Sequence, residues 1–96
     1  MKRNVRFIQD EKTLLLRLAQ LLKEGWTLLD SLELLLPHFS PHAHEALTMT
    51  ENLLKKGEPL AAIFSALGYD EHYLLPLANA KSRKQMIRGL QQVARQ

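Results

Sequence analysis

The chain has 96 residues, of which 46% are hydrophobic and 24% are charged, and its formal net charge is +3. These values are ordinary for one globular domain with a single hydrophobic core. The absence of cysteine excludes disulfides, thiolate catalysis and cysteine-ligated zinc, and no apolar run approaches the roughly 18 residues that a membrane-spanning helix needs.

Leucines at spacings of three and four predict a first helix that is capped by Asp10 and ends before Gly25. Thr27 is the expected N-cap of a second helix, with Asp30 in a capping-box-like position, and Pro37 is its expected end. Both helices are predicted to turn leucines inward: Leu14, Leu15, Leu18, Leu21 and Leu22, then Leu28, Leu29, Leu32, Leu35 and Leu36.

A third helix is expected to open at the pair Ser40-Pro41 and to end at Gly57. Its high polar content predicts a partly exposed helix, with an inner face of Ala43, Ala46, Leu47, Leu53 and Leu54. A fourth helix is predicted from Pro59, at its first helical position, to Leu67, with the stripe Leu60, Ile63, Phe64 and Leu67.

Two further helices complete the predicted set. Asp70 can cap a short fifth helix through Leu77, which Pro76 should kink because proline lacks an N–H. A sixth is expected to start near Ser82 and to bury Met86, Leu90, Val93 and Ala94. We therefore predict an all-α domain at residues 10–96, a compact six-helix bundle built from three αα-hairpins, preceded by a basic N-terminal tail at residues 1–9.

One sequence pattern occurs twice. Residues 21–28 read LLKEGWTL and residues 53–60 read LLKKGEPL, with the glycine at the same place in both copies. In each copy an apolar segment ends on lysine, a glycine supplies a left-handed helix stop, and a helix-opening residue follows two places later. Gly25 and Gly57 are therefore predicted to be structural turn residues of two αα-hairpins.

The segment from Leu18-Ala19-Gln20-Leu21-Leu22 to Leu35, followed by the second copy through Phe64, resembles the first cytoplasmic domain of the type II secretion F family. These are polytopic membrane platform proteins of type II secretion, type IV pili and competence pseudopili. The resemblance spans about Asp10 to Gln96. It departs from the family at Ala80-Lys81-Ser82, where members usually carry a Gly-Glu turn, so no ion bound by that turn is carried over to Lys81. This divergence favours a competence-type member.

The resemblance implies a non-enzymatic domain on the cytoplasmic side of the cell membrane that couples an assembly ATPase to pilus or pseudopilus assembly. It also implies partners among the other pseudopilus proteins, no cofactor, and a membrane anchor contributed by helices outside these residues. We accordingly expect an apolar segment of about 20 residues soon after Gln96. The alternatives are a small basic nucleic-acid-binding domain and a free-standing protein-interaction module.

Charge is distributed unevenly along the chain. All ten acidic residues lie between Asp10 and Glu71. The charged residues among the last sixteen positions are all cations: Lys81, Arg83, Lys84, Arg88 and Arg95. Such residues usually form a solvated helix face, but they are candidates for contact with a partner or with anionic lipid headgroups. They would also serve the nucleic-acid alternative. That alternative is disfavoured, because the aromatic residues are not interleaved with the basic ones.

Other candidate sites are few. His38, His42 and His44 gather around Pro41, but no further ligand stands at a convincing spacing, so no metal site is predicted. No serine lies in a nucleophile-elbow context and no phosphate-binding glycine loop is present, so no catalytic residue is predicted. A partner or homo-oligomer interface is predicted at three apolar side chains beyond the inner stripes: Leu16, Trp26 and Leu34. For Trp26, which follows the glycine turn, a ring that caps the core is the favoured alternative.

Overall fold

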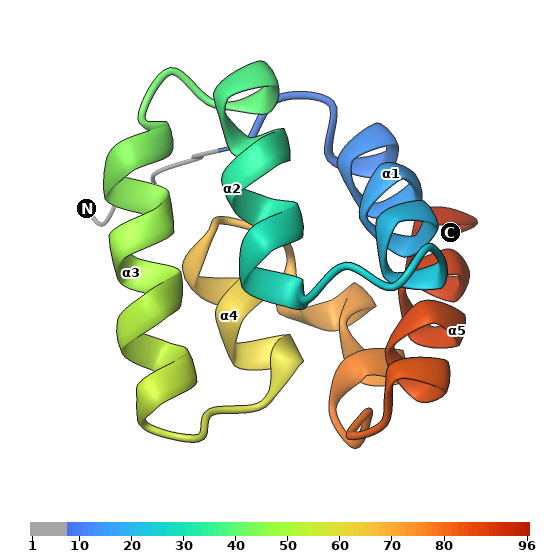
Figure 1. Ribbon diagram of the computed structural model, residues 1–96. Helices are drawn as coiled ribbons and strands as arrows, with labels where there is room; N and C mark the ends of the chain where they lie inside the picture. The colour runs from blue at the N-terminus through green and yellow to red at the C-terminus, as the bar shows by residue number, and fades with distance from the viewer. Residues whose placement is uncertain (1–7) are drawn as a thin grey trace.

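The structure is a computed structural model that describes residues 8–96, and all regular elements in that range are helical (Figure 1). Residues 1–7, which make up most of the predicted basic tail, lie outside the described residues. Five α-helices are present, together with two single-turn 3-10 helices η1 and η2. Their bounds are α1 Glu11–Lys23, α2 Leu28–Phe39, α3 Ala43–Lys55, α4 Leu60–Ala66, η1 Glu71–Tyr73, η2 Leu75–Leu77 and α5 Arg83–Ala94. The all-α prediction is confirmed.

The predicted fifth helix is replaced by η1 and η2, so the six-helix bundle of three hairpins is not what forms. Asp70 does cap the segment, because its side chain accepts a hydrogen bond of 2.9 Å from the His72 backbone N–H. Pro76 then disfavours the α-helical conformation at the residue before it and brings no N–H of its own. Only single turns remain on either side of Leu74.

The two predicted glycine turns are present, and a third of the same kind follows them. Gly25, Gly57 and Gly68 have φ values of +101°, +75° and +103°. At each turn the glycine N–H bonds the carbonyl three residues back, and the next N–H bonds the carbonyl five back, as Trp26 does to Leu21 at 3.1 Å. This is the Schellman motif, which satisfies the last carbonyls of α1, α3 and α4 with the same geometry.

The helix starts follow the predictions less closely. The Thr27 hydroxyl accepts the Asp30 N–H at 3.1 Å, and Ser82 forms a full capping box with Gln85. Asp10, however, adopts a left-handed φ of 53° and makes no side-chain cap. Pro59 is the N-cap of α4 and not its first helical residue.

The junction between α2 and α3 also differs from the prediction. Helix α2 continues through Pro37 to Phe39, although proline lacks an N–H and its ring crowds the carbonyl four residues back. The Ser40 N–H still bonds the Leu36 carbonyl at 2.9 Å and closes the last turn. Ser40 follows α2, and its hydroxyl accepts the His42 N–H at 3.0 Å, so α3 begins at Ala43, two residues beyond Pro41.

The helices form two groups around one core. Helices α1 and α5 lie side by side, and α2 and α3 form the other side, with α4 between the groups (Figure 1). Fully buried side chains from several of these helices, including Leu14, Leu32, Phe64 and Leu90, meet in the core. As predicted, α3 is partly exposed: it buries only Ala46 and Thr50 completely.

Long-range hydrogen bonds set how α1 meets the C-terminal half. The buried Tyr69 hydroxyl donates to the Glu11 carbonyl oxygen at 2.9 Å, and its ring packs edge-on against Phe64 at a centroid distance of 5.1 Å. Burial, and secondarily the nearby Glu11 and Asp10 carboxylates, raise the pKa of the Tyr69 phenol. The phenol is therefore held in its neutral, hydrogen-bond-donating form.

Candidate functional site

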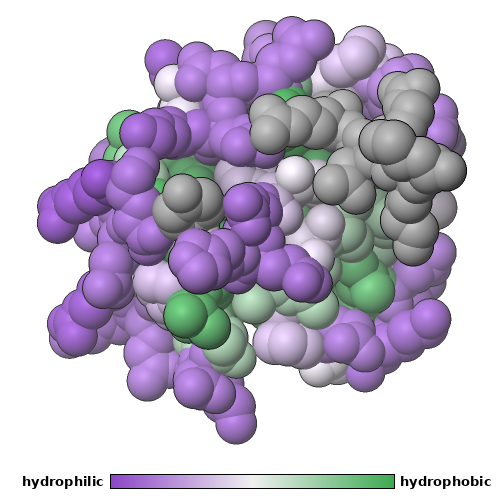
Figure 2. Space-filling model, turned by 180° about the vertical axis from the view of Figure 1, so that it is seen from behind, coloured by the Kyte–Doolittle hydropathy of each residue, from purple (hydrophilic) through white to green (hydrophobic). Residues whose placement is uncertain are grey.

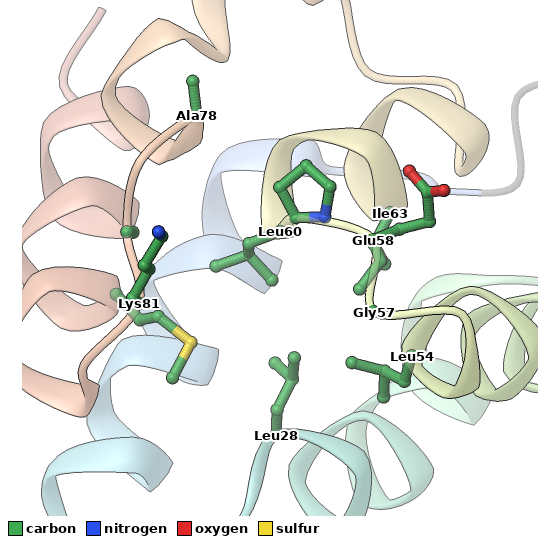
Figure 3. Close-up of a pocket in the computed structure, with 11 residues that line it drawn as sticks. Leu28, Leu54, Gly57, Glu58, Leu60, Ile63, Ala78 and Lys81 are labelled. Atoms are coloured by element: carbon green, nitrogen blue, oxygen red, sulfur yellow. The ribbon is translucent and has the colours of Figure 1, made fainter.

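A concave apolar surface lies where the α3–α4 turn faces the starts of α2 and α5. It is an open pocket of about 340 Å³, which we call the hairpin groove. Its apolar wall comes from Leu28, Leu54, Leu60, Ile63 and Met86, and its charged neighbours are Glu58 and Lys81. In Figure 3 the side chains of Leu28, Leu54 and Leu60 point toward the space between them, and the Glu58 carboxylate points away from it.

The groove exists because inner-face residues near helix ends are not fully covered. Leu28, Leu54 and Met86 were each predicted to be buried, and each is only half-buried. Leu28 opens α2, Leu54 lies in the last turn of α3, and Met86 lies in the first turn of α5. Periodicity identified these residues as inward-facing, but it gives no sign that three helix ends leave a space between them.

Of the predicted turn residues, Gly57 lines the groove and Gly25 does not. A Cβ atom added at either glycine would meet nothing within 4 Å, so the left-handed φ alone requires glycine there.

Lys81 is the predicted basic residue that reaches the groove. Its backbone N–H donates to the Gln85 Oε1 atom at 2.9 Å, so the capping box of α5 also fixes the segment that carries Lys81. The ammonium group belongs to an exposed side chain at the groove's edge. This site therefore combines an apolar wall with an exposed cation whose backbone is fixed by the cap of α5.

Arg83 has a role that the sequence did not indicate. Its Nη1 atom donates to the carbonyl oxygens of Leu22 at 2.9 Å and Trp26 at 2.6 Å. A guanidinium at the C-terminal end of α1 is also favourably placed for the helix dipole. Arg83 thus ties the start of α5 to the end of α1, which are distant from each other in the sequence.

The remaining predicted cations, Lys84, Arg88 and Arg95, are all exposed on or at the end of α5. Within the part of the chain that the structure describes, none of the three forms an ion pair. Figure 2, which views the molecule from behind, shows mainly hydrophilic side chains on the side where α1 and α5 lie. The structure therefore groups these three residues on one helix, apart from the hairpin groove.

The predicted interface residues are exposed but belong to different elements. Leu16 on α1 is 50% exposed, Leu34 on α2 is 46% exposed, and Trp26 in the intervening turn is 40% exposed. Leu75 in η2 is more exposed still, at 75%, and was counted among the residues of the predicted fifth helix. An interface role for the first three residues stays a prediction.

The three histidines do not converge. Within residues 8–96, no group of three His, Asp or Glu side chains is placed to hold a metal ion. His42 Nδ1 lies 3.6 Å from Glu45 Oε1 on the exposed face at the start of α3. That contact is an i,i+3 surface pair of the kind that contributes little to stability.

Together, the fold and the groove define the class of molecule: an all-α domain with glycine-closed hairpins, an apolar groove and a separate basic helix face. Comparisons of the chain with protein-family models, with curated proteins and with solved structures found no match. Within residues 8–96, each helix falls short of the length or the apolar character required to cross a membrane.

Proposed function

We propose that residues 10–96 are a docking domain of a membrane platform protein of the type II secretion F kind, and that the domain couples an assembly ATPase to pilus or pseudopilus assembly. The observation that carries the proposal is the repeated hairpin. Two helix pairs with the same sequence pattern are closed by the same Schellman turn, at Gly25 and at Gly57. These are the segments on which the resemblance to that family rests.

The mode of action follows from packing and not from reactive groups. A close-packed core resists deformation, so a force applied to one face of the domain is transmitted to the rest. Arg83 and Tyr69 support this stiffness by joining α1 to segments in the C-terminal part of the chain. In this proposal the domain binds its partner and transmits movement, and catalyses no reaction.

The hairpin groove is the surface best suited to a partner segment. It is concave and mainly apolar, and Lys81 and Glu58 stand beside it to orient an incoming segment by charge. We assign this groove to the assembly ATPase.

Co-purification of the assembly ATPase encoded near the gene tests the proposal. Leu54→Glu and Met86→Glu place a carboxylate in the groove at half-buried positions, and each should reduce retention of the ATPase by at least about tenfold. Leu75→Glu, at an exposed position outside the groove, is the matched control and should retain the ATPase. Circular dichroism verifies that each variant keeps its helix content. Unchanged retention by both groove variants would contradict the assignment.

The exposed cations on α5 favour a second candidate, binding of nucleic acid through phosphates. Titration with duplex DNA at two salt concentrations distinguishes the two functions. Binding that weakens steeply with added salt would support the nucleic-acid function, because phosphate contacts release counterions. No binding to DNA, together with retention of the ATPase, supports the docking domain.

A further inference from the structure

The outward side of the α1–α5 pair presents a second surface that the docking proposal does not use. The two helices run antiparallel, because Arg83 at the start of α5 contacts Leu22 and Trp26 at the end of α1. At the other end, Val93 and Gln96 line a small pocket together with Glu11 and Lys12. The exposed sides of both helices therefore run next to each other along their length.

Apart from Arg83, which contacts the end of α1, the cations on α5 and at its end lie on one side of the helix. Lys84, Arg88 and Arg95 are spaced by four and then seven positions, which at about 100° per residue places them within an arc of about 40°. All three are exposed, whereas Leu90, Val93 and Ala94 on the other side are buried. Lys23, exposed in the last turn of α1, lies at the end of α1 that Arg83 contacts.

The four cations outnumber the acids that lie next to them in the chain or across the pocket at the C-terminal end of α5. No ion pair involves any of these four cations within residues 8–96. The acid next to Lys23 is Glu24, which accepts a hydrogen bond of 3.0 Å from the neutral Gln20 amide and keeps its negative charge. After Glu71 the chain contains no further acid. Glu24 lies beside Lys23 at one end and Glu11 lies near Gln96 at the other, so the four cations outnumber these two acids and the net charge is positive.

A half-exposed tryptophan lies next to the start of α5. Trp26 is the only tryptophan of the chain, is 40% exposed, and follows the Gly25 turn directly. Its carbonyl accepts the 2.6 Å bond from Arg83, so its backbone is fixed next to the start of α5. Indole rings favour the boundary between water and lipid, because one edge donates a hydrogen bond while the ring is apolar.

We propose that this face, formed by Lys23, Trp26, Lys84, Arg88 and Arg95, binds the surface of an anionic membrane. The cations lie against lipid phosphates and the Trp26 ring enters the headgroup layer. A lipid surface suits the combination better than duplex DNA does, because a half-exposed tryptophan gains from leaving water and a duplex backbone offers it no apolar layer. The inference goes beyond the docking proposal and does not depend on it.

Vesicle binding tests the inference with the intact chain. Trp26 emission should shift to the blue on addition of vesicles of phosphatidylcholine with about 30% phosphatidylglycerol, and pure phosphatidylcholine vesicles should leave it unchanged. Lys84→Gln combined with Arg88→Gln should weaken binding to the anionic vesicles roughly 30-fold, since each basic residue near such a surface contributes about a factor of five. Higher salt should weaken binding of the unaltered chain.

The matched control is Lys55→Gln combined with Lys56→Gln, which removes two exposed lysines at the end of α3 and should leave vesicle binding within about twofold. The inference is overturned by equal binding to neutral vesicles, by equal loss in both double variants, or by no binding to anionic vesicles. Salt-sensitive binding to duplex DNA without any vesicle-induced shift of Trp26 would assign the face to nucleic acid instead. Circular dichroism of both double variants verifies that the helices are intact.

Discussion

At Gly89 the backbone of α5 approaches η2 so closely that a side chain has no room. A Cβ atom there would lie 2.7 Å from Leu77 Cδ2 and 2.9 Å from the Pro76 carbonyl oxygen. The carbonyl belongs to the backbone and cannot move aside as a flexible side chain could. Sequence periodicity identifies Gly89 only as one residue of a helix, because the close approach depends on a different element, η2, that precedes α5 in the chain.

Gly89→Ala is therefore expected to destabilise the domain by about 1–3 kcal/mol. Alanine forms helices better than glycine by up to about 1 kcal/mol, so the overpacking has to exceed that gain. Urea unfolding followed by circular dichroism measures the difference. Gln92→Ala, on the exposed side of the same helix, is the control and should change stability by less than about 0.5 kcal/mol. A more stable Gly89→Ala variant would show that η2 does not pack against α5 as described.

The two hairpin glycines give a graded prediction. Gly57, at φ +75°, is near the conformation that other residues sometimes adopt, while Gly25, at φ +101°, is farther from it. Gly57→Ala should cost about 1 kcal/mol and Gly25→Ala about 2 kcal/mol, with no steric contribution at either site. Gly57→Asn should be milder than Gly57→Ala, because asparagine tolerates left-handed backbone. Equal stability of all three variants and the unaltered protein in urea unfolding would refute the left-handed turns.

At the scale of elements, the residues that start and stop the helices were easier to predict than which helices pack against each other. The glycine stops, the Thr27 cap and the Ser82 cap depend on residues within one turn of one another, so their signals are local. The contact of α1 with the start of α5 involves Arg83, and its contact with the α4–η1 turn involves Tyr69, and the acceptors of both lie far earlier in the chain. The segment around Pro76 was predicted as one helix, because the pattern of leucines does not reveal how early proline interrupts it.

The contact between Arg83 and the end of α1 should stabilise the fold as well as orient α5. Arg83→Gln removes the charge and the two-carbonyl geometry of Nη1, and is expected to lower the free energy of unfolding by about 1 kcal/mol. Arg83→Lys should recover only part of this, since an ammonium group lacks the planar fork. Lys84→Gln is the neighbouring control and should leave stability within about 0.5 kcal/mol. An Arg83→Gln variant as stable as the control would contradict the capping role.

Tyr69 makes the packing of the α4–η1 turn against α1 sensitive to alkaline pH. The pKa of its phenol is raised in the folded state, and the unfolded value is about 10, so the folded protein holds the proton more tightly. The Tyr69 phenol therefore contributes fully to the free energy of unfolding below a pH of about 10, and this contribution is lost as the pH rises above that value. Tyr69→Phe should lower stability by about 1 kcal/mol at neutral pH and should reduce the loss of stability above a pH of about 10. Parallel alkaline slopes for the two proteins in urea unfolding would contradict this account.

At the scale of the whole molecule, the structure places two different surfaces at separate positions. The hairpin groove collects apolar side chains from the ends of three helices, while α5 carries exposed cations and its first residue, Arg83, contacts the Trp26 carbonyl. Periodicity predicted most of the residues that face inward, and charge asymmetry predicted the basic segment. Neither signal could predict the groove, because it arises from how hairpins distant in sequence meet.

Hydrogen exchange of the domain with and without the assembly ATPase tests the central claim most directly. If the ATPase occupies the hairpin groove, amide exchange should slow at the start of α2, in the α3–α4 turn around Gly57 and at the start of α5, while the exposed face of α3 keeps its rate. Slowed exchange confined to other elements, or no change at a saturating concentration of ATPase, would contradict the account of this protein as a docking domain.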